Sequence, residues 1–464
     1  MNKTDVESNP EFHYTEGHKV AFLTVDVNTS RRIFEDASVE PKKISKNKQD
    51  YEYVPWGSTD DAPNQAITKA YKNPATSTGL EFNITLGYGD GVMPVRKELD
   101  GDKLKLVPVL DNTEINEFLE HNDINLYLLE QMTDVKHFFN VFPEIILNRE
   151  DTASKRRVVE LNHKEAAFSR WTKMNDKGRI EYHLYCSKFG TSEDIKPEDL
   201  DVTPALDFKR PILDLKRRMG LAPDLNGKAR DEKKFRYIVP VTFPTPGKFY
   251  YQKPYWWSIF ESGWYDYAAA IPEFKNALLK NQMTIKYVVY IVEEYWTELF
   301  AAEGIKTPEA KQKRKKEEYD NIQDFLSGAK NTGKAVTSKI KYFQDKENKY
   351  IKIEPVENAF QGGEYIEDSE EASNIISYSL GVHPSLIGSS PGKSKTINGT
   401  EARELFTIKQ ALMKPVRDRL LRPLYLVKAI NKWPEDIHFA IPNLQLTTLD
   451  KNTGAEKTIS QPAL

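Results

Sequence analysis

The longest regular pattern of apolar and polar positions lies near the end of the chain, between residues 371 and 432. Its first part carries apolar residues at the spacing of one helical face: Ala372, Ile375, Ile376 and Leu380. Asp368 or Ser369 can cap this helix, whose acidic first turn suits the helix dipole. Gly381 can end it in the left-handed conformation, and Pro384 prevents its continuation.

A second amphipathic run follows after a polar loop. Asn398 and Glu401 stand three positions apart, as in a capping box. The apolar positions then repeat at helical spacing: Ala402, Leu405, Phe406, Ala411, Leu412, Val416, Leu420, Leu424, Val427 and Ile430. Because Pro415 lies inside this run, the pattern predicts two helical pieces joined by a kink.

The rest of the chain mixes helical and strand patterns. Helices are predicted from Pro63 to about Tyr71, after Pro74, and from Thr113 to Thr133. Strands are predicted in four segments: Arg156–Leu161, Ile180–Cys186, Phe235–Phe243 and Thr284–Val292, the last as a buried strand. Residues 1–50 are polar and predict an arm with one strand at Val20–Val25. The expected fold class is therefore α+β.

Composition excludes several classes of protein. The chain has 464 residues, enough for two or three domains, and a formal net charge of only −3, unlike a dedicated DNA-binding module. Its one cysteine, Cys186, allows neither an internal disulfide nor a thiolate metal cluster. The N-terminus does not resemble a signal peptide, and the longest strongly apolar run, Tyr287–Val292, is too short to span a membrane. We expect a soluble protein that is intracellular or released by lysis.

The sequence offers no convincing catalytic, cofactor or metal site. The glycines from Gly87 to Gly91 lack the spacing of a dinucleotide fingerprint, and a tight turn explains them better. Gly388 and Gly392 are one residue too close for a phosphate-binding loop. His163 and His183 lack metal-ligand spacing. We therefore expect that the protein is not an enzyme and needs no cofactor.

Two segments are basic. Residues 209–236 hold ten Lys or Arg against four Asp or Glu, and residues 311–316 hold five cations in six positions. Either segment can be a solvated surface, the commoner case, with charge pairs four residues apart in the second. Either can instead contact DNA or an acidic partner.

Several motifs, taken in order, resemble tailed-bacteriophage or prophage portal proteins. The turn Gly381-Val382-His383-Pro384-Ser385-Leu386-Ile387-Gly388, the start Asn398-Gly399-Thr400-Glu401 and the helix with Pro415 resemble the C-terminal signature of that family. His383 stands where the family often has proline. Tyr53-Val54-Pro55-Trp56-Gly57 and Asn140-Val141-Phe142-Pro143-Glu144 resemble earlier portal motifs.

The resemblance implies a portal fold with wing, stem, clip and minimal crown, assembled as a ring of about twelve subunits. It divides the chain into these parts: an N-terminal arm at 1–50, wing and first stem region at 51–199, clip at 200–252, second stem helix at 253–282, the second part of the wing at 283–432, and a small crown or C-terminal tail at 433–464. Within the second part of the wing it implies a tunnel loop at about 389–398 and the kinked helix at 399–432.

The implied function is a channel at one capsid vertex through which double-stranded DNA is packaged and ejected. The implied partners are the large terminase subunit, a head–tail adaptor, and the major capsid protein with its scaffold. The chain would lie in the virion, and in the host cytoplasm during assembly. The residues implied for the DNA channel are Lys393, Lys395 and Asn398; those facing terminase at the clip are Arg217, Arg218, Lys228, Arg230, Lys233 and Lys234.

Two alternatives remain open at this point. One is a nucleic-acid-binding protein that forms no ring and uses the basic segments 209–236 and 311–316. It predicts DNA affinity that falls steeply with salt. The other is a nucleotide-dependent enzyme that uses the loop at 388–394, and it predicts protection by ATP.

Overall fold

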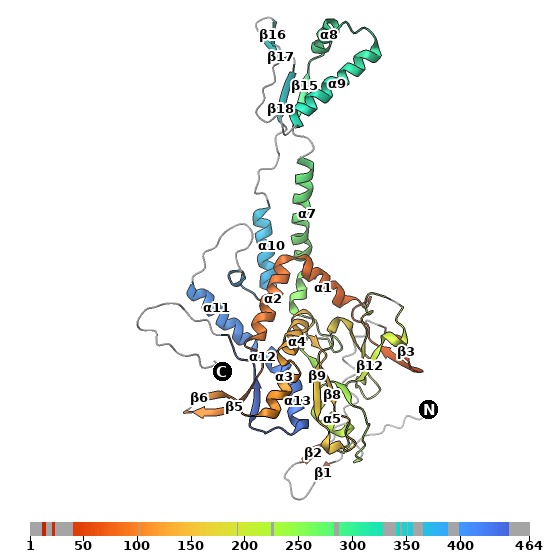
Figure 1. Cartoon of the computed structure of the whole chain (residues 1–464), viewed down its shortest axis with the longest axis vertical. Coiled ribbons are helices and arrows are strands. Elements are labelled where there is room, and N and C mark those ends of the chain that lie inside the picture. Colours follow the sequence, from red (N-terminus) through yellow and green to blue (C-terminus); the bar gives the residue numbers. More distant parts are fainter. Residues whose placement is uncertain are drawn as a thin grey trace, which may run out of the picture. The chain divides into compact units, whose positions relative to one another are not determined.

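The structure is a computed structural model that describes residues 12–14, 21–23, 40–101, 103–192, 194–223, 227–282, 287–327, 340–343, 346–349, 351–355, 365–387 and 399–444. The chain divides into two compact units (Figure 1). Unit 1 comprises Met1–Ala269 with Glu367–Leu464, and unit 2 comprises Ala270–Ile366. Helices and strands alternate along the chain, which confirms the predicted α+β class.

Proline and asparagine side chains start the first helices of unit 1. These helices are α1 (Ala62–Lys72), α2 (Pro74–Tyr88), α3 (Thr113–His121) and α4 (Ile124–Phe138). Asn73 caps α2 by accepting a hydrogen bond from the Thr76 backbone N–H at 3.0 Å, and Asn112 caps α3 in the same way. The single helix predicted from Thr113 to Thr133 is wrong, because the chain turns at Asp123, which has a left-handed φ of 40°.

The strands of unit 1 form small antiparallel sheets. Three of these sheets have three strands: β19 (Ile437–Ala440), β5 (Met93–Asp100) and β6 (Lys103–Pro108); β13 (Arg236–Ile238), β8 (Glu144–Leu147) and β9 (Val158–Asn162); and β10 (Ser169–Trp171), β11 (Tyr182–Tyr185) and β12 (Asp201–Pro204). The two-stranded sheets pair β3 (Lys42–Lys46) with β4 (Gln49–Tyr53), β7 (Asn140–Val141) with β14 (Val241–Thr242), and β1 (Phe12–Tyr14) with β2 (Ala21–Leu23).

The predicted strands near residues 156–161 and 180–186 are confirmed as β9 and β11. The prediction of one continuous strand from Phe235 to Phe243 is wrong, because two separate strands form there. The segment forms β13 and β14, which pair with different partners, and Pro240 lies between them. Proline has no backbone N–H to donate to a sheet, so the pairing changes there.

The C-terminal helices follow the predicted pattern with one more break. They are α10 (Ile366–Ser379), α11 (Gly399–Leu412), α12 (Lys414–Leu420) and α13 (Arg422–Asn431). Gly381 takes the predicted left-handed conformation after α10, with a φ of 62°. The prediction of two helical pieces is wrong, because a second proline, Pro423, starts α13 and separates it from α12.

The largest core cluster of unit 1 joins helices and strands from both ends of the chain. Apolar residues of α3, α4 and α13 pack with those of β8, β9 and β19. Figure 1 shows these elements side by side in the lower part of the drawing. The short helix α5 (Pro211–Arg218) contributes the fully buried Leu215 to the same cluster. Residues predicted to belong to separate regions therefore share one core.

Unit 2 is a smaller assembly of helices and hairpins. Its elements are the second part of α7 (Trp264–Gln282), β15 (Tyr287–Ile291), α8 (Glu293–Ala302), α9 (Pro308–Ser327), β16 (Ile340–Phe343), β17 (Lys346–Lys349) and β18 (Ile351–Pro355). β15 confirms the strand predicted near Thr284–Val292 but not its burial, since Tyr290 is half exposed and β18 is the one strand that pairs with it among the described residues. Pro272 lies inside α7. Among the described residues, no helix is long and apolar enough to cross a membrane.

Candidate docking and DNA-facing surfaces

The segment predicted to form the clip, 200–252, belongs to unit 1. Its strand β12 pairs with β11, and its strands β13 and β14 pair with β8 and β7. The separate unit of the chain begins instead at Ala270. The strands of 200–252 pair with residues 16 to 102 positions earlier in the chain, and short strands carry no local signal that identifies their partner.

Several cations of the basic segment are held by partners within the same chain. Arg218 Nε donates to Asp214 Oδ2 at 3.1 Å, and its NH2 group donates to the Ala205 carbonyl at 3.0 Å. Arg217 Nε donates to the Pro223 carbonyl, and Lys234 lies over the ring of Tyr182. These contacts use much of the positive charge that the composition suggested was available to a partner.

The remaining cations predicted to face terminase are on the surface. Lys228, Arg230 and Lys233 are all exposed, on the stretch between α5 and β13. Asp231, between them, binds the fully buried Arg156 through two hydrogen bonds of 2.8 Å. This pair fixes the exposed stretch to the strand that begins at Val158, so the three cations form a surface of unit 1.

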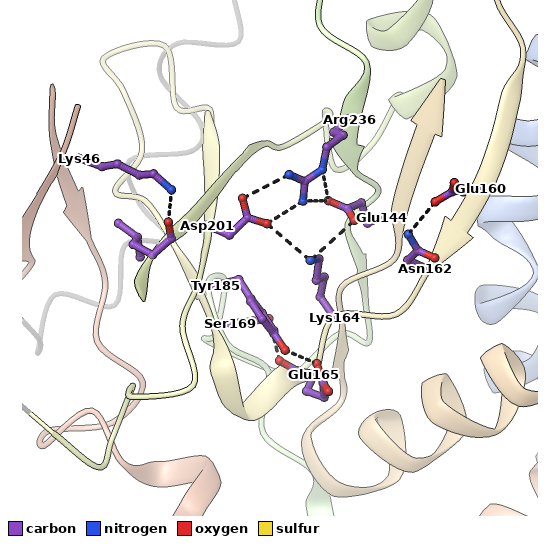
Figure 2. A network of polar contacts seen from close by, with 11 residues as sticks. Lys46, Glu144, Glu160, Asn162, Lys164, Glu165, Ser169, Tyr185, Asp201 and Arg236 are labelled. Carbon is purple, nitrogen blue, oxygen red and sulfur yellow. Dashed lines mark hydrogen bonds and ion pairs between the residues drawn. The ribbon is translucent and has the colours of Figure 1, made fainter. Parts of the chain in front are cut away.

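The most extensive polar cluster in this part of the chain was not predicted (Figure 2). Arg236 on β13 donates to Glu144 Oε1 at 2.6 Å and to Asp201 Oδ2 at 2.6 Å. Lys164 Nζ lies 3.7 Å from Glu144 Oε2 and 3.5 Å from Asp201 Oδ2. Two cations thus balance two carboxylates, and together they join the sheet of β8 to the sheet of β12.

The carboxylate of Asp201 is held in its ionised form. Burial raises the pKa of Asp201, but its hydrogen bond to Arg236 and the charge of Lys164 outweigh burial and leave the pKa below its usual range. Glu144 is almost fully buried, and Arg236 binds it through two nitrogens. The paired charges of this cluster join strands that lie far apart in the sequence, and removal of one partner would leave a buried charge unpaired.

A second buried cluster surrounds His163. Its Nε2 lies 3.0 Å from Asp134 Oδ2, and its Nδ1 contacts Gln131 Nε2 at 2.6 Å. Burial lowers the pKa of His163, but the hydrogen bond and charge of Asp134, with Glu130 and Glu165, outweigh burial and raise it. The pair resembles the His–carboxylate part of a catalytic triad. Its described neighbours supply no serine or cysteine nucleophile in hydrogen-bond contact with the imidazole.

Cations also hold the C-terminal ends of the helices α10 and α2. Lys409 on α11 donates to the carbonyl of Gly381 at 2.6 Å, where α10 ends. Arg417 on α12 donates to the carbonyls of Leu86 at 2.6 Å and Gly87 at 3.0 Å, where α2 ends. Cations at helix C-termini satisfy unpaired carbonyls and favour the helix dipole. The predicted channel residues Lys393, Lys395 and Asn398 lie outside the described residues.

The basic run of unit 2 lies on α9 and is largely paired with α8. Arg314 donates to Glu318 at 2.8 Å, one turn later, and to Glu303 at 2.9 Å. Lys311 and Lys315 lie over the rings of Phe300 and Trp296, which stack on each other. The predicted charge pair four residues apart is therefore confirmed, and the run holds two helices together.

Two cavities lie at the surface of unit 1. One of about 380 Å³ lies between the loop at 175–181 and α5, lined by both cations and carboxylates such as Arg179 and Asp207. Another of about 440 Å³ lies beside Phe118 and Trp433. Within the described residues, no group of three or more His, Cys, Asp or Glu is placed to hold a metal ion.

Comparison with known proteins identifies solved structures with a similar fold. No family model matches the sequence, and no curated protein matches it significantly. Solved structures do match. A chain in the virion of a native gene transfer agent (GTA) particle has a TM-score of 0.52 and 13% sequence identity, and the match covers 90% of this chain and 89% of that chain.

Two further structures give the same result. They are the neck of an empty GTA particle computed with C6 symmetry and the neck of a native GTA particle computed with C12 symmetry, each with a TM-score of 0.52 and 13% identity. The matches cover 89% and 88% of this chain, respectively, and 88% of the matched chain in both cases. At this identity the likeness concerns the fold. The chain therefore shares its fold with a chain of the GTA virion and neck, in agreement with the predicted resemblance to phage portal proteins.

Proposed function

We propose that this chain is a portal subunit, which assembles into a ring and forms a DNA channel at one vertex of a phage or phage-like particle. The observation that carries the proposal is the fold likeness to a chain of the GTA neck over about nine tenths of both chains. One of those necks was computed with C12 symmetry, which supports a ring of twelve copies here. The ordered sequence motifs support the same function independently.

The proposal includes the partners and the place that a portal requires. Double-stranded DNA would pass through the ring, the large terminase subunit and later a head–tail adaptor would dock on it, and the capsid protein with its scaffold would surround it. The chain would lie in the virion and, during assembly, in the host cytoplasm. We propose no catalytic role, because a portal is passive while its terminase supplies the work.

We also propose a new position for the clip. In a portal the clip lies between the two stem helices, and most of unit 2, residues 283–365, lies in sequence between α7 and α10. Residues 200–252, in contrast, share the sheets and core of unit 1. We therefore assign α7 and α10 to the stem and residues 283–365 to the clip. Terminase would then dock on unit 2, and not on the exposed cations from Lys228 to Lys233.

The channel should contact DNA weakly. Tight neutralisation of phosphates by lysine and arginine would hold DNA in place through counterion release. Lys393, Lys395 and Asn398 stay the candidates for the tunnel loop. Lys409 and Arg417, on the helices that follow this loop in sequence, each donate to backbone carbonyls and have little capacity left for phosphate.

The alternative of a DNA-binding protein without a ring has lost much of its support. It relied on the segments 209–236 and 311–316, in which Arg218, Arg236 and Arg314 are paired with carboxylates. Exposed cations remain in both segments, so DNA binding is best measured directly.

The experiment that tests the proposal is native mass measurement and negative-stain imaging of the full-length protein. We expect rings of about twelve copies with a central hole. In the same preparation, affinity for short duplex DNA should be weak and should change little between 50 and 200 mM salt. A protein that stays monomeric and binds duplex DNA with a steep salt dependence would replace the portal function with the DNA-binding alternative.

A further inference from the structure

The helix α11 leaves apolar side chains exposed on one side. Gln410, on another side of the helix, and Met413, which follows the helix, are buried. On the other side, Leu405, Ile408 and Leu412 follow at intervals of three and four residues. Ile408 is 57% exposed and Leu412 is 67% exposed. Apolar residues at this spacing are typical of a helix that docks into a partner, because a helix facing only water is polar on its outer side.

Acidic residues flank these three side chains, which we call the α11 stripe. Glu404 and Glu401 precede Ile408 by four and seven residues, so they lie on the same side of the helix. Both are exposed. A surface that covers the stripe should therefore be apolar and carry positive charge.

The β5–β6 hairpin of the same chain offers such a surface. Leu99, near its turn, is 78% exposed. Lys97 is exposed two residues earlier on β5, and therefore points to the same side of the hairpin. Lys97 pairs across the hairpin with Leu106, which is only partly buried. We call Lys97, Leu99 and Leu106 the hairpin face. Figure 1 shows β5 and β6 projecting from the remainder of unit 1.

We infer that the hairpin face of one copy docks on the α11 stripe of a second copy. Within one chain the two surfaces do not cover each other, since Leu99, Ile408 and Leu412 are all exposed in the same structure. The two surfaces differ, so each copy can use its hairpin on one neighbour and its helix on another. Contacts of this head-to-tail kind form rings when the rotation between copies closes, and open filaments when it does not. In this respect the inference rests on the proposed ring and names a contact within it.

Two substitutions and one control test the contact in the full-length chain. Ile408→Glu places a charge in the α11 stripe, and Leu99→Glu places one in the hairpin face. Leu126→Glu is the control, because Leu126 is 50% exposed on a helix outside both surfaces. Sedimentation velocity over a concentration series should show that each test variant needs at least about 100-fold more protein to assemble. The control should assemble as the unaltered chain does, and circular dichroism should show that all three fold.

Mixing and charge exchange identify the partner surface. Ile408→Glu keeps its hairpin face and Leu99→Glu keeps its α11 stripe, so an equimolar mixture should form 1:1 pairs and nothing larger. Lys97→Glu alone should weaken assembly, as should Glu401→Lys with Glu404→Lys. Combining all three changes in one chain should restore most of the loss, because the charges again oppose each other.

The outcomes separate this inference from the proposed function. If the unaltered chain forms rings that neither Ile408→Glu nor Leu99→Glu weakens, the inferred contact is wrong and the proposed ring is supported. If Ile408→Glu prevents assembly but the charge exchange restores nothing, the hairpin is not the partner of the stripe and the inference fails. If the unaltered chain forms only dimers and both substitutions break them, the inferred contact is supported and the proposed portal ring is rejected. A chain that stays monomeric at every concentration overturns both.

Discussion

At the scale of single residues, unit 1 buries two histidines in opposite electrostatic environments. His183 is fully buried among the rings of Phe142, Trp171 and Tyr185, and neither ring nitrogen has a hydrogen-bond partner among the described residues. His163 is also buried, but carboxylates surround it. The sequence showed both only as histidines near predicted strands. Their opposite behaviour comes from neighbours that other parts of the chain supply.

His183 should make the protein sensitive to acid. Burial, with the charge of Lys164, lowers the pKa of His183 to about 3, below its usual 6.5. Below pH 6.5 the unfolded chain therefore binds a proton that the folded chain does not, and at pH 5 this costs about 2 kcal/mol of folding free energy. His183→Phe fits the aromatic surroundings and removes the titration. Urea unfolding should show a smaller loss of stability for this variant between pH 7 and pH 5; an equal loss in both proteins would contradict the argument.

His163 should have the opposite effect on the pH dependence of stability. Because Asp134, with Glu130 and Glu165, raises the pKa of His163 despite burial, its contribution to stability is complete below pH 6.5. The contribution is lost as the pH rises through the folded-state pKa. His163→Gln can still donate to Asp134 but does not titrate. The unfolding free energy of this variant should therefore be lower than that of the unaltered chain near pH 6, and the difference should shrink as the pH rises above 6.5. A constant difference across this range would show a loss of packing alone.

At the scale of elements, the boundaries are set by side chains that reach backbone groups far away in the sequence. Arg417 holds the last carbonyls of α2, and Lys409 holds the carbonyl of Gly381 after α10. Gly89 follows α2 with φ 58° and ψ −129°, a conformation in which a side chain is strained. The helices themselves were predictable from spacing, but these long-range contacts were not.

Replacing Gly89 should lower the free energy of unfolding far more than replacing Gly101, another glycine with positive φ. A Cβ at Gly89 would lie 2.5 Å from the carbonyl oxygen of Pro442 and 2.9 Å from Arg417 NH2. Gly101, at the turn of the β5–β6 hairpin, has a φ of 62° and nothing within 4 Å of an added Cβ. Gly89→Ala should lower the free energy of unfolding by about 3 kcal/mol and Gly101→Ala by about 1 kcal/mol. Equal losses in chemical denaturation would mean that close packing at Gly89 is not what requires glycine.

At the scale of the whole molecule, the two units differ in what stabilises them. The four hydrophobic core clusters among the described residues consist of residues of unit 1. Unit 2 relies on a small aromatic group around Trp296 and on the ion pairs of Arg314. Unit 1 should therefore fold without most of unit 2.

Excision of unit 2 tests this independence. Phe274 on α7 contacts Tyr365, at the start of α10, with ring centroids 5.3 Å apart. A short Gly/Ser linker in place of residues 278–363 should therefore join the two helices without strain. We expect the shortened chain to unfold at a denaturant midpoint close to that of unit 1 in the full chain, and to lose binding to a terminase-like partner. Global unfolding of the shortened chain would show that unit 1 depends on unit 2. As a control, Arg314→Met should weaken only unit 2.

The sequence by itself determined the local features of this protein. Helical spacing, capping residues, prolines and Gly381 specify elements through neighbours a few positions away, so the α+β class and most helices could be predicted. The order of the motifs also indicated the portal-like fold. Tertiary structure alone decided which strands pair, where the separate unit begins, and that Arg236, Glu144, Asp201 and Lys164 meet in one balanced cluster. The physical reason is that pairing, burial and charge neutralisation depend on residues far apart in the chain, whose approach no local pattern encodes.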